Sequence, residues 1–339
     1  MRRKTLTLAA AAAAALAILA AILLCVLFLA KSPVDKNTPD KAIRIDRGSS
    51  AGMVAALLHD EGLVKSPALF QLALRLAGAD RKLKAGTYRI EGGTSIWRIV
   101  RILSEGRVSQ VKVTIPEGST LGTIGDALER AGICSRKDFE QAASDAGLAA
   151  RGGVPGKSFE GFLFPDTYSF PEDSDPETVL LAMTANFFRK LETIAPIGSE
   201  GRGSLYENVI LASIVEREYR EASEAGQMAS VFKNRLAIGM ALQSCATVVY
   251  IITEKLGKPH PKVVYYSDLA IPSPYNTYLH RGLPPAPISN PGETALKAVF
   301  NSPESDYLYF RLIDEAKGLH RFSRTFEEHT GEAIPVKGF

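Results

Sequence analysis

Little in this sequence of 339 residues points to metal or disulfide chemistry. It holds three cysteines, and because Cys25 lies in an apolar run near the start, only Cys134 and Cys245 remain for the rest of the chain. Two cysteines allow one disulfide, but their spacing neither demands a pair nor forms a disulfide framework. The five histidines are scattered, and no Cys/His cluster has the spacing of metal ligands. We therefore expect no metal and no cofactor.

The sequence also lacks a large excess of either positive or negative charge. Lys and Arg number 40 against 37 Asp and Glu, and no basic run follows residue 4. Nucleic-acid binding needs concentrated positive charge, so we exclude it. A hydrophobic content of 46% and a charged content of 23% are ordinary for globular proteins. The length is sufficient for two domains, each with its own core.

A long uncharged apolar run is present, over residues 6–30. It is long enough to cross a bilayer as a helix, and the basic residues before it place residues 1–5 in the cytoplasm. A cleaved signal peptide would have a shorter apolar core and a small-residue exit, whereas this run ends in Val, Leu, Phe, Leu and Ala. We predict a single-pass anchor in the cell (inner) membrane, a linker over 31–41, and an extracytoplasmic, periplasmic remainder.

A pattern of strand, Gly-Ser/Thr turn and short amphipathic helix recurs in the next part of the chain. The first copy begins at residue 42, and the second, over 111–133, repeats it at an offset of 70 residues. A third, fainter copy begins at Tyr88. Such units resemble LysM modules, which bind the N-acetylglucosamine sugars of cell walls, and purely structural α+β units account for them equally well. We predict an α+β fold with a LysM-like domain over 42–108 and a larger catalytic domain over 109–335.

The larger domain is organised around residues 204–220. This segment opens with a capping box, and 209–215 is apolar on every side except Ser213, as in a helix buried all round. Glu216 follows directly. A carboxyl group at the mouth of an apolar helix is poorly solvated, so its pKa should rise toward the range that a general acid needs. Structural ion pairs also perturb carboxylates, so this residue alone decides nothing.

Two further stretches carry side chains that suit a sugar. Residues 159–168 crowd aromatic rings around two carboxylates, although such clusters more often form a core. Residues 273–292 are rich in proline, which makes an extended and rigid segment, and they also carry Tyr, Asn and Thr. A rigid polar lining suits a ring-shaped polar ligand, and an ordered connection is the alternative of equal weight.

Six blocks in this order resemble the endolytic murein transglycosylase family, also called YceG-like. The blocks are Glu160–Tyr168, Leu211–Glu216, Val231–Leu236, Tyr275–Tyr278, Gly282–Pro285 and Asn290–Gly292. The resemblance implies a membrane-anchored enzyme with a LysM-like region that cuts nascent peptidoglycan strands internally. It also implies that Glu216 is the catalytic glutamate. The chain has Cys245-Ala246 where many members have Asp-Pro, so we expect no essential second acid there.

The reaction implied by the resemblance needs one carboxyl group. Glu216 protonates the oxygen between N-acetylmuramic acid and N-acetylglucosamine, and its carboxylate then takes a proton from the 6-hydroxyl of the muramic acid. That hydroxyl closes onto the anomeric carbon and leaves a 1,6-anhydro end, which terminates glycan elongation. Glu218 is the alternative acid. The hypothetical substrate-binding residues are Gln243, Tyr275, Asn276, Glu160 and Asp166.

Two other classes of function stay open at this point. A muramidase would use water, with Glu160 or Asp166 as its second carboxylate. A non-catalytic peptidoglycan-binding scaffold of the elongation machinery would not depend on Glu216 at all. For each reading the expected partners are peptidoglycan strands, the membrane and the peptidoglycan synthases of that machinery.

Overall fold

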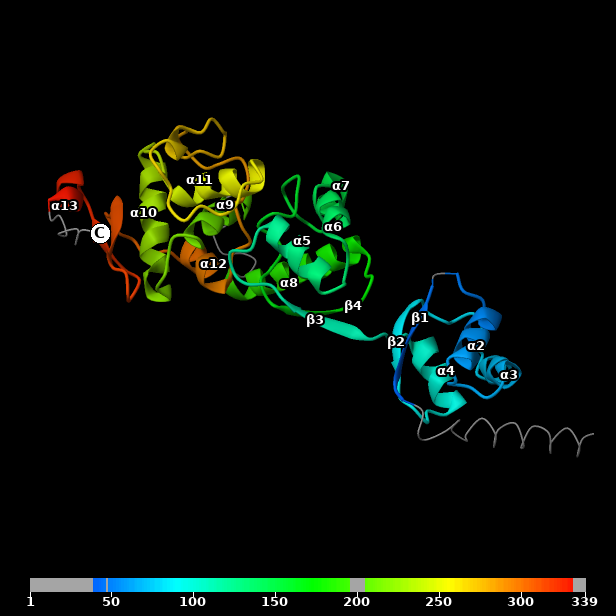
Figure 1. Cartoon of the computed structure of the whole chain (residues 1–339). Coiled ribbons are helices and arrows are strands. Elements are labelled where there is room, and N and C mark those ends of the chain that lie inside the picture. The colour runs from blue at the N-terminus through cyan, green and yellow to red at the C-terminus, as the bar shows by residue number, and fades with distance from the viewer. Residues whose placement is uncertain (1–38, 47, 196–204, 332–339) are drawn as a thin grey trace, which may run out of the picture. The chain divides into compact units, whose positions relative to one another are not determined.

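The computed structural model describes residues 39–46, 48–195 and 205–331, and these divide into two compact units (Figure 1). The first unit runs to Val111 and includes Pro171–Asp173, and the second holds the other residues from Lys112 onward. The predicted membrane run over 6–30 lies outside the described residues. No helix among the described residues is long and apolar enough to cross a bilayer.

The first unit has a small antiparallel sheet covered by helices. Strand β1 (Lys41–Ile45) pairs with β2 (Gly86–Ile90), which sets Ile43 opposite Tyr88. Because side chains alternate along a strand, one face of this pair is apolar and buried. That face shares a single core with residues of α2 (Ala51–Asp60), α3 (Pro67–Leu76) and α4 (Ile96–Glu105). The unit is thus a small α+β domain with its own core.

The three predicted strand–turn–helix copies are all present. Helices α2, α4 and α5 (Leu121–Arg130) are each 10 residues long. Each follows a left-handed glycine, at Gly48, Gly93 and Gly118, and each is capped by a Ser or Thr hydroxyl. In the second copy, β3 (Gln110–Thr114) pairs with β4 (Thr167–Pro171). The likeness to LysM modules stays a prediction.

The second unit is mostly helical. After α5 it comprises α6 (Arg136–Ala143), α7 (Ala146–Arg151), α8 (Pro176–Ile194), α9 (Leu205–Val215), η1 (Ala222–Glu224), α10 (Ala225–Ala237), α11 (Cys245–Tyr250), η2 (Ile251–Lys255), η3 (Asp268–Ala270), α12 (Glu293–Phe300) and α13 (Phe326–Thr330). Strands β5 (Tyr309–Asp314) and β6 (Leu319–Ser323) form an antiparallel hairpin near the C-terminus. The mixture of helices and small sheets confirms the mixed helix-and-sheet class.

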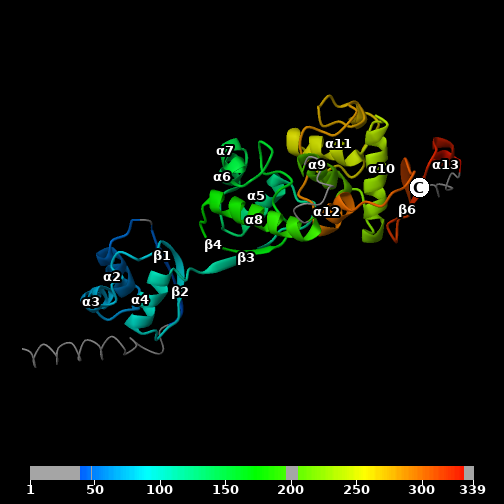
Figure 2. The same cartoon turned by 180° about the vertical axis from the view of Figure 1, so that it is seen from behind.

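Helix α9 lies at the centre of this unit. It packs against α10 and α12, and α12 packs in turn against α8 and α10 (Figures 1 and 2). Every residue from Val209 to Val215 is buried, as the apolar pattern predicts. The hydroxyl of Ser213 donates to the Ile210 carbonyl at 2.7 Å and accepts the Ile288 N–H at 3.0 Å, which satisfies the one polar side chain of this run. Its predicted cap, Ser204, lies outside the described residues.

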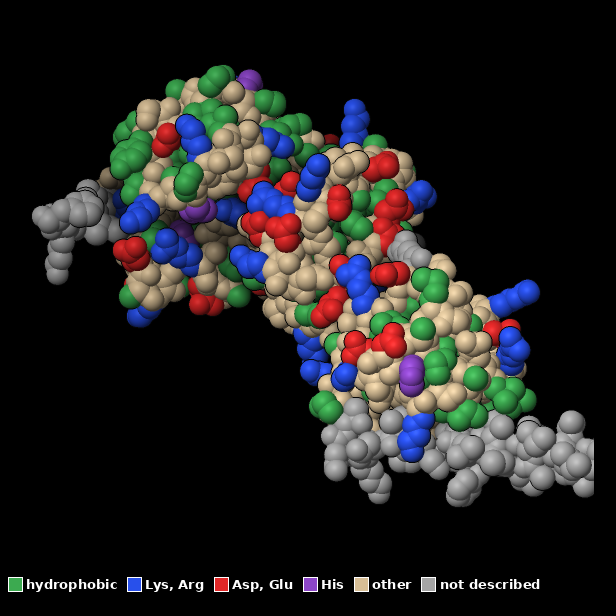
Figure 3. Space-filling model, turned by 45° about the vertical axis from the view of Figure 1, so that its right-hand side comes forward, with side chains coloured by type: hydrophobic (Ala, Val, Ile, Leu, Met, Phe, Trp, Pro, Cys, Tyr) green, Lys and Arg blue, Asp and Glu red, His purple; other side chains and the backbone are tan. Residues whose placement is uncertain are grey.

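The surface carries charges of both signs. On the face drawn in Figure 3, Lys and Arg side chains are interspersed with Asp and Glu side chains rather than gathered by sign. Such a face lacks the continuous positive field by which proteins bind nucleic acids.

Candidate active site

Glu216 is held where α9 ends, between two backbone segments. Its Oε2 accepts the Gly292 N–H at 2.9 Å, and its Oε1 accepts the Tyr219 hydroxyl at 3.4 Å. On another side lies Gly118, where an added Cβ would stand 3.6 Å from the Glu216 Cγ. Gly292 is the N-cap residue of α12, so its N–H also carries the positive end of that helix dipole.

Burial governs the charge of Glu216. It raises the pKa of this carboxyl to about 7, with the Gly292 N–H opposing the rise and the charge of Glu117 adding to it. Tyr219 and Arg217 oppose the rise more weakly. A carboxyl group with a pKa near neutrality can give a proton in one step and take one in the next. This is the raised pKa that the sequence predicts for Glu216.

Asn290 connects the segments around Glu216. This residue is fully buried. Its Oδ1 accepts the Leu163 N–H at 2.8 Å, and its Nδ2 donates to the Ser119 carbonyl at 3.0 Å and to Glu160 Oε1 at 3.1 Å. Its backbone N–H donates to Ser119 at 2.8 Å, and its carbonyl accepts the Gly118 N–H at 3.0 Å. One side chain thereby fixes the chain two residues before Gly292.

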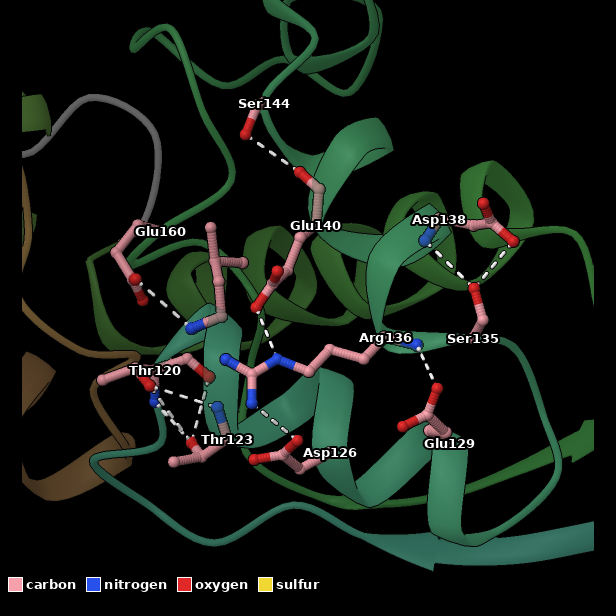
Figure 4. A network of polar contacts seen from close by, with 11 residues as sticks. Thr120, Thr123, Asp126, Glu129, Ser135, Arg136, Asp138, Glu140, Ser144 and Glu160 are labelled. Carbon is pink, nitrogen blue, oxygen red and sulfur yellow. Dashed lines mark hydrogen bonds and ion pairs between the residues drawn. The ribbon is translucent and has the colours of Figure 1, made fainter. Parts of the chain in front are cut away.

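Glu160 is buried behind Asn290 and supports it. The residue is 5% exposed, and its Oε2 accepts the Leu121 N–H at 3.2 Å, at the first residue of α5 (Figure 4). Burial raises its pKa to about 8, against the effect of the Leu121 N–H. A carboxyl group in this position has no open face toward a sugar or a water nucleophile. The hypothesis that Glu160 binds substrate or acts as the second carboxylate of a muramidase does not fit this placement.

The raised pKa of Glu160 predicts that the stability of the protein depends on pH. The native state holds this proton more tightly than the unfolded chain, whose pKa is the ordinary 4.5. The stabilisation is therefore complete below about pH 4.5 and is lost as pH rises through 8. Between pH 5 and pH 8.5 we expect the free energy of unfolding to fall by about 4 kcal/mol more in the wild type than in Glu160→Gln.

This expectation is checked by chemical denaturation across that pH range. Glu160→Gln should be somewhat less stable than wild type at pH 5, because an amide offers one acceptor fewer to Leu121 and Asn290. The exposed Glu207 on α9 supplies the control Glu207→Gln, which should keep the wild-type pH dependence. An unchanged slope in Glu160→Gln would contradict the assignment.

Glu218, the alternative acid, has a different set of partners. Its Oε1 accepts a hydrogen bond from the Ser244 hydroxyl, and Ala246 supplies a backbone hydrogen bond. Burial raises its pKa, and these two hydrogen bonds oppose the rise. Its carboxylate thereby holds the start of α11. The structure gives Glu218 this supporting role, and its role as an acid stays a prediction.

Gln243 and Tyr275 keep accessible surface. Gln243 is exposed and adopts a left-handed backbone with φ of 51°, a strained conformation for a residue other than glycine. The Tyr275 ring packs 5.2 Å from the Tyr250 ring, and Lys255 Nζ lies about 5 Å from the centre of each. Burial raises the pKa of Tyr275 to about 12, so its hydroxyl stays a hydrogen-bond donor. A substrate contact by either residue stays a prediction.

Asn276 and Asp166 lie in other environments. Asn276 is fully buried, its Nδ2 donates to the carbonyls of Leu269 and Ile271 at 2.9 Å, and its Oδ1 accepts the Tyr278 N–H. In the structure its polar atoms shape the loop, and a sugar contact of Asn276 stays a prediction. Asp166 is exposed and accepts a hydrogen bond from Asn186 at 3.0 Å, which lowers its pKa. It shares no described hydrogen bond with Glu216.

Four neighbours of Glu216 escaped the sequence analysis: Gly118, Tyr219 and Gly292 lie against its side chain, and the charge of Glu117 acts on its pKa. In the sequence, Gly118 belongs to the turn of a repeated strand–turn–helix unit, and Gly292 belongs to a Pro-rich block. The available signal was that both glycines lie beside helix starts, where free backbone N–H groups face a carboxylate favourably.

The two cysteines that the structure describes form no disulfide. Cys134 and Cys245 are both free, and the Cys245 Sγ lies 3.0 Å from the Tyr278 hydroxyl. Within the described part of the chain, no group of three or more His, Cys, Asp or Glu residues is arranged to hold a metal ion.

Comparison with known proteins identifies the family of this chain. The YceG-like family matches residues 43–333. The chain belongs to the YceG-like family. A curated relative from Bacillus subtilis (strain 168), named endolytic murein transglycosylase, is 32% identical over 314 residues, covering 88% of this chain and 85% of the relative.

Two further YceG-like comparisons agree. A protein of the same name from Streptococcus pneumoniae serotype 2 is 27% identical, and the match covers 88% of this chain and 58% of that longer protein. A crystal structure titled as a putative yceG-like protein from Listeria monocytogenes is 31% identical, with a TM-score of 0.56, and covers 87% of this chain and 99% of that one.

Proposed function

We propose that this YceG-like protein cuts the bond between N-acetylmuramic acid and N-acetylglucosamine inside nascent peptidoglycan strands, leaves 1,6-anhydro ends and so terminates glycan elongation. At the coarser level the chain is a peptidoglycan lytic transglycosylase, the activity for which its curated relatives are named. The site of cleavage, the product and the place of action are the proposal.

The observation that carries the proposal is the half-buried carboxyl group of Glu216, which lies between Gly118 and Gly292. With a pKa of about 7 it is protonated in a large share of molecules at neutral pH. It gives that proton to the glycosidic oxygen as the bond to the anomeric carbon breaks. The carboxylate then stands ready for the proton of the 6-hydroxyl as that oxygen bonds to the same carbon.

The Gly292 N–H supports both halves of this sequence. Its hydrogen bond to Oε2 stabilises the charged carboxylate once the proton has left. The other oxygen, Oε1, has only the longer contact to Tyr219. We assign to it the proton that Glu216 gives to the glycosidic oxygen and later takes from the 6-hydroxyl. Because the nucleophile, the 6-hydroxyl, belongs to the substrate, no bound water has to be activated for the bond to break.

We also propose that residues 6–30 anchor the enzyme in the cell membrane, with the N-terminus in the cytoplasm and the catalytic unit outside it. The support is the length of the uncharged run and the basic residues before it. An enzyme tethered there meets new strands as synthases release them, so synthases of the elongation machinery are the proposed partners.

Product analysis tests the proposal directly. We expect the purified full-length protein, in detergent, to convert uncrosslinked glycan strands into internal fragments that end in 1,6-anhydro-N-acetylmuramic acid, seen by mass spectrometry. A muramidase would add water and leave reducing ends. Borohydride reduces and so labels reducing ends, whereas anhydro ends do not react with it. Reducing ends as the main product would overturn the proposed chemistry, and intact strands would favour a scaffold.

A further inference from the structure

Glu117 is an exposed carboxylate without a partner. It lies in the turn between β3 and α5, and among the described residues it makes no hydrogen bond and no ion pair. The turn itself is rigid: the Ser119 hydroxyl donates to the Pro116 carbonyl at 2.7 Å, and Asn290 bonds to Gly118 and Ser119. The Glu117 side chain therefore projects from a fixed backbone, although nothing in the fold requires its charge.

The carboxylate of Glu117 lies against Gly292. A Cβ added to Gly292 would stand 2.0 Å from the Glu117 Oε1 and 2.4 Å from its Cδ, so the Glu117 side chain would have to move if a larger residue replaced Gly292. The N–H of the same Gly292 donates to Glu216 Oε2 at 2.9 Å. Standard bond lengths then put the nearest oxygens of Glu117 and Glu216 within about 8 Å of one another.

This upper limit of about 8 Å is compatible with a known arrangement of two carboxyl groups. Enzymes that break glycosidic bonds with a pair of carboxyl groups hold them about 5 to 9.5 Å apart, on either side of the scissile bond. The two groups here also differ in environment, since Glu216 is largely buried and Glu117 is exposed to solvent. Burial favours the neutral form of Glu216, and unlike environments of the two carboxyl groups are typical of such pairs.

We propose that Glu117 is the second carboxylate of this site: it contacts the muramic acid ring and stabilises the positive charge that develops on it as the bond breaks. The inference rests on the proposed function of Glu216. Glu117 forms no covalent bond and takes no proton. The proton that leaves Glu216 goes to the departing oxygen, and the proton of the 6-hydroxyl returns to Glu216, so the balance of the reaction is unchanged.

The groups that face Glu117 are consistent with this role. Its charge helps to raise the pKa of Glu216 and that of the Tyr219 hydroxyl, while Arg217 acts on Glu216 in the opposite direction. Arg217 itself donates to the Gly118 carbonyl at 3.3 Å. No cation within the described residues forms an ion pair with Glu117, so its field is free to act on a ligand.

The test compares the full-length wild type with Glu117→Gln, Glu117→Asp and the control Glu293→Gln. Glu293 is the residue after Gly292 and is paired with Lys297 at 2.5 Å. Initial rates are counted as all new glycan ends, whether anhydro or reducing, across pH 4.5 to 8.5. Scoring the rate apart from the product keeps a failure of the proposed chemistry distinguishable from a failure of this inference.

We expect Glu117→Gln to lower the plateau rate about 100-fold, as loss of one charge-stabilising group does in other enzymes. Glu117→Asp should lose less, because it keeps the charge but shortens the side chain. The alkaline limb of the Glu117→Gln profile should also move to lower pH, since less negative charge remains to hold the proton on Glu216.

Two results would overturn the inference. In the first, the plateau rate of Glu117→Gln stays within about threefold of wild type, and only the alkaline limb of the pH profile moves. Glu117 would then act only through the pKa of Glu216. In the second, Glu293→Gln loses as much activity as Glu117→Gln. Unfolding midpoints are measured for each variant, and a misfolded Glu117→Gln leaves Glu117→Asp to decide between these outcomes.

Discussion

Glu216→Gln is expected to lower glycan cleavage by at least about a thousandfold while leaving the fold intact. The amide keeps the shape of the side chain and still accepts the Gly292 N–H, but it has no proton to give at neutral pH and cannot take one afterwards. Fragments ending in 1,6-anhydro sugars, measured by mass spectrometry, should disappear. Glu207→Gln, at an exposed position on the same helix, should cleave at the wild-type rate.

The pH profile of the wild type belongs to the same prediction. Because the acid must carry its proton, the rate should fall as pH rises through about 7, the pKa of Glu216. Glu218→Gln is the informative comparison, since Glu218 also has a raised pKa but bonds to Ser244. Full activity in Glu216→Gln together with inactivity in Glu218→Gln would show that the acid has been misassigned.

Asn290→Ala is expected to destabilise the second unit by about 3 to 5 kcal/mol, the largest stability effect that we predict. Truncation leaves the buried Leu163 N–H without an acceptor and removes donors from Glu160 and from the Ser119 carbonyl. Each buried polar group left unsatisfied costs about 1 to 3 kcal/mol. Chemical denaturation at pH 7 measures the loss.

The exposed Asn301 offers a control for Asn290, because its side chain makes one long contact of 3.5 Å to the Ile194 carbonyl. Asn301→Ala should change stability by less than about 0.5 kcal/mol. Any Asn290→Ala protein that still folds should also cleave slowly, since Gly292 is no longer fixed against Glu216. A loss of under about 1 kcal/mol would show that water replaces these hydrogen bonds.

The parts of this site that follow from local patterns were predictable. The apolar run over 209–215 identifies a helix buried all round, and a carboxyl group at its end must be poorly solvated. The Gly and Ser/Thr positions of the repeated units likewise fix each helix start through backbone conformation and capping. Both effects operate within a few residues, so a sequence displays them.

The contacts that position Glu216 were not predictable in this way. Asn276 and Asn290 lie in the same Pro-rich stretch and are both fully buried, and neither fact is visible in the composition. Asn276 bonds to carbonyls five and seven residues away, whereas Asn290 bonds to residues 127 and 171 positions away. Local propensity carries no information about partners at such separations.

Glu160 is a second case in which the sequence did not reveal the surroundings of a residue. Its aromatic surroundings suggested a sugar platform, but the carboxyl group is enclosed, and its partners are the start of α5 and Asn290. Whether an aromatic cluster faces a ligand or a core depends on what packs over it. That choice is made by tertiary structure, which the spacing of Phe residues does not encode.

The long separations bridged by Asn290 also set an order of events during synthesis. The turn at Gly118 and the carboxyl group of Glu216 emerge from the ribosome well before residues 290–292, which must close loops of 127 and 171 residues to reach their partners. Contacts so distant along the chain form late in folding. Until they form, Glu216 has neither its Gly292 donor nor the burial that raises its pKa, so the nascent chain lacks the acid that we propose.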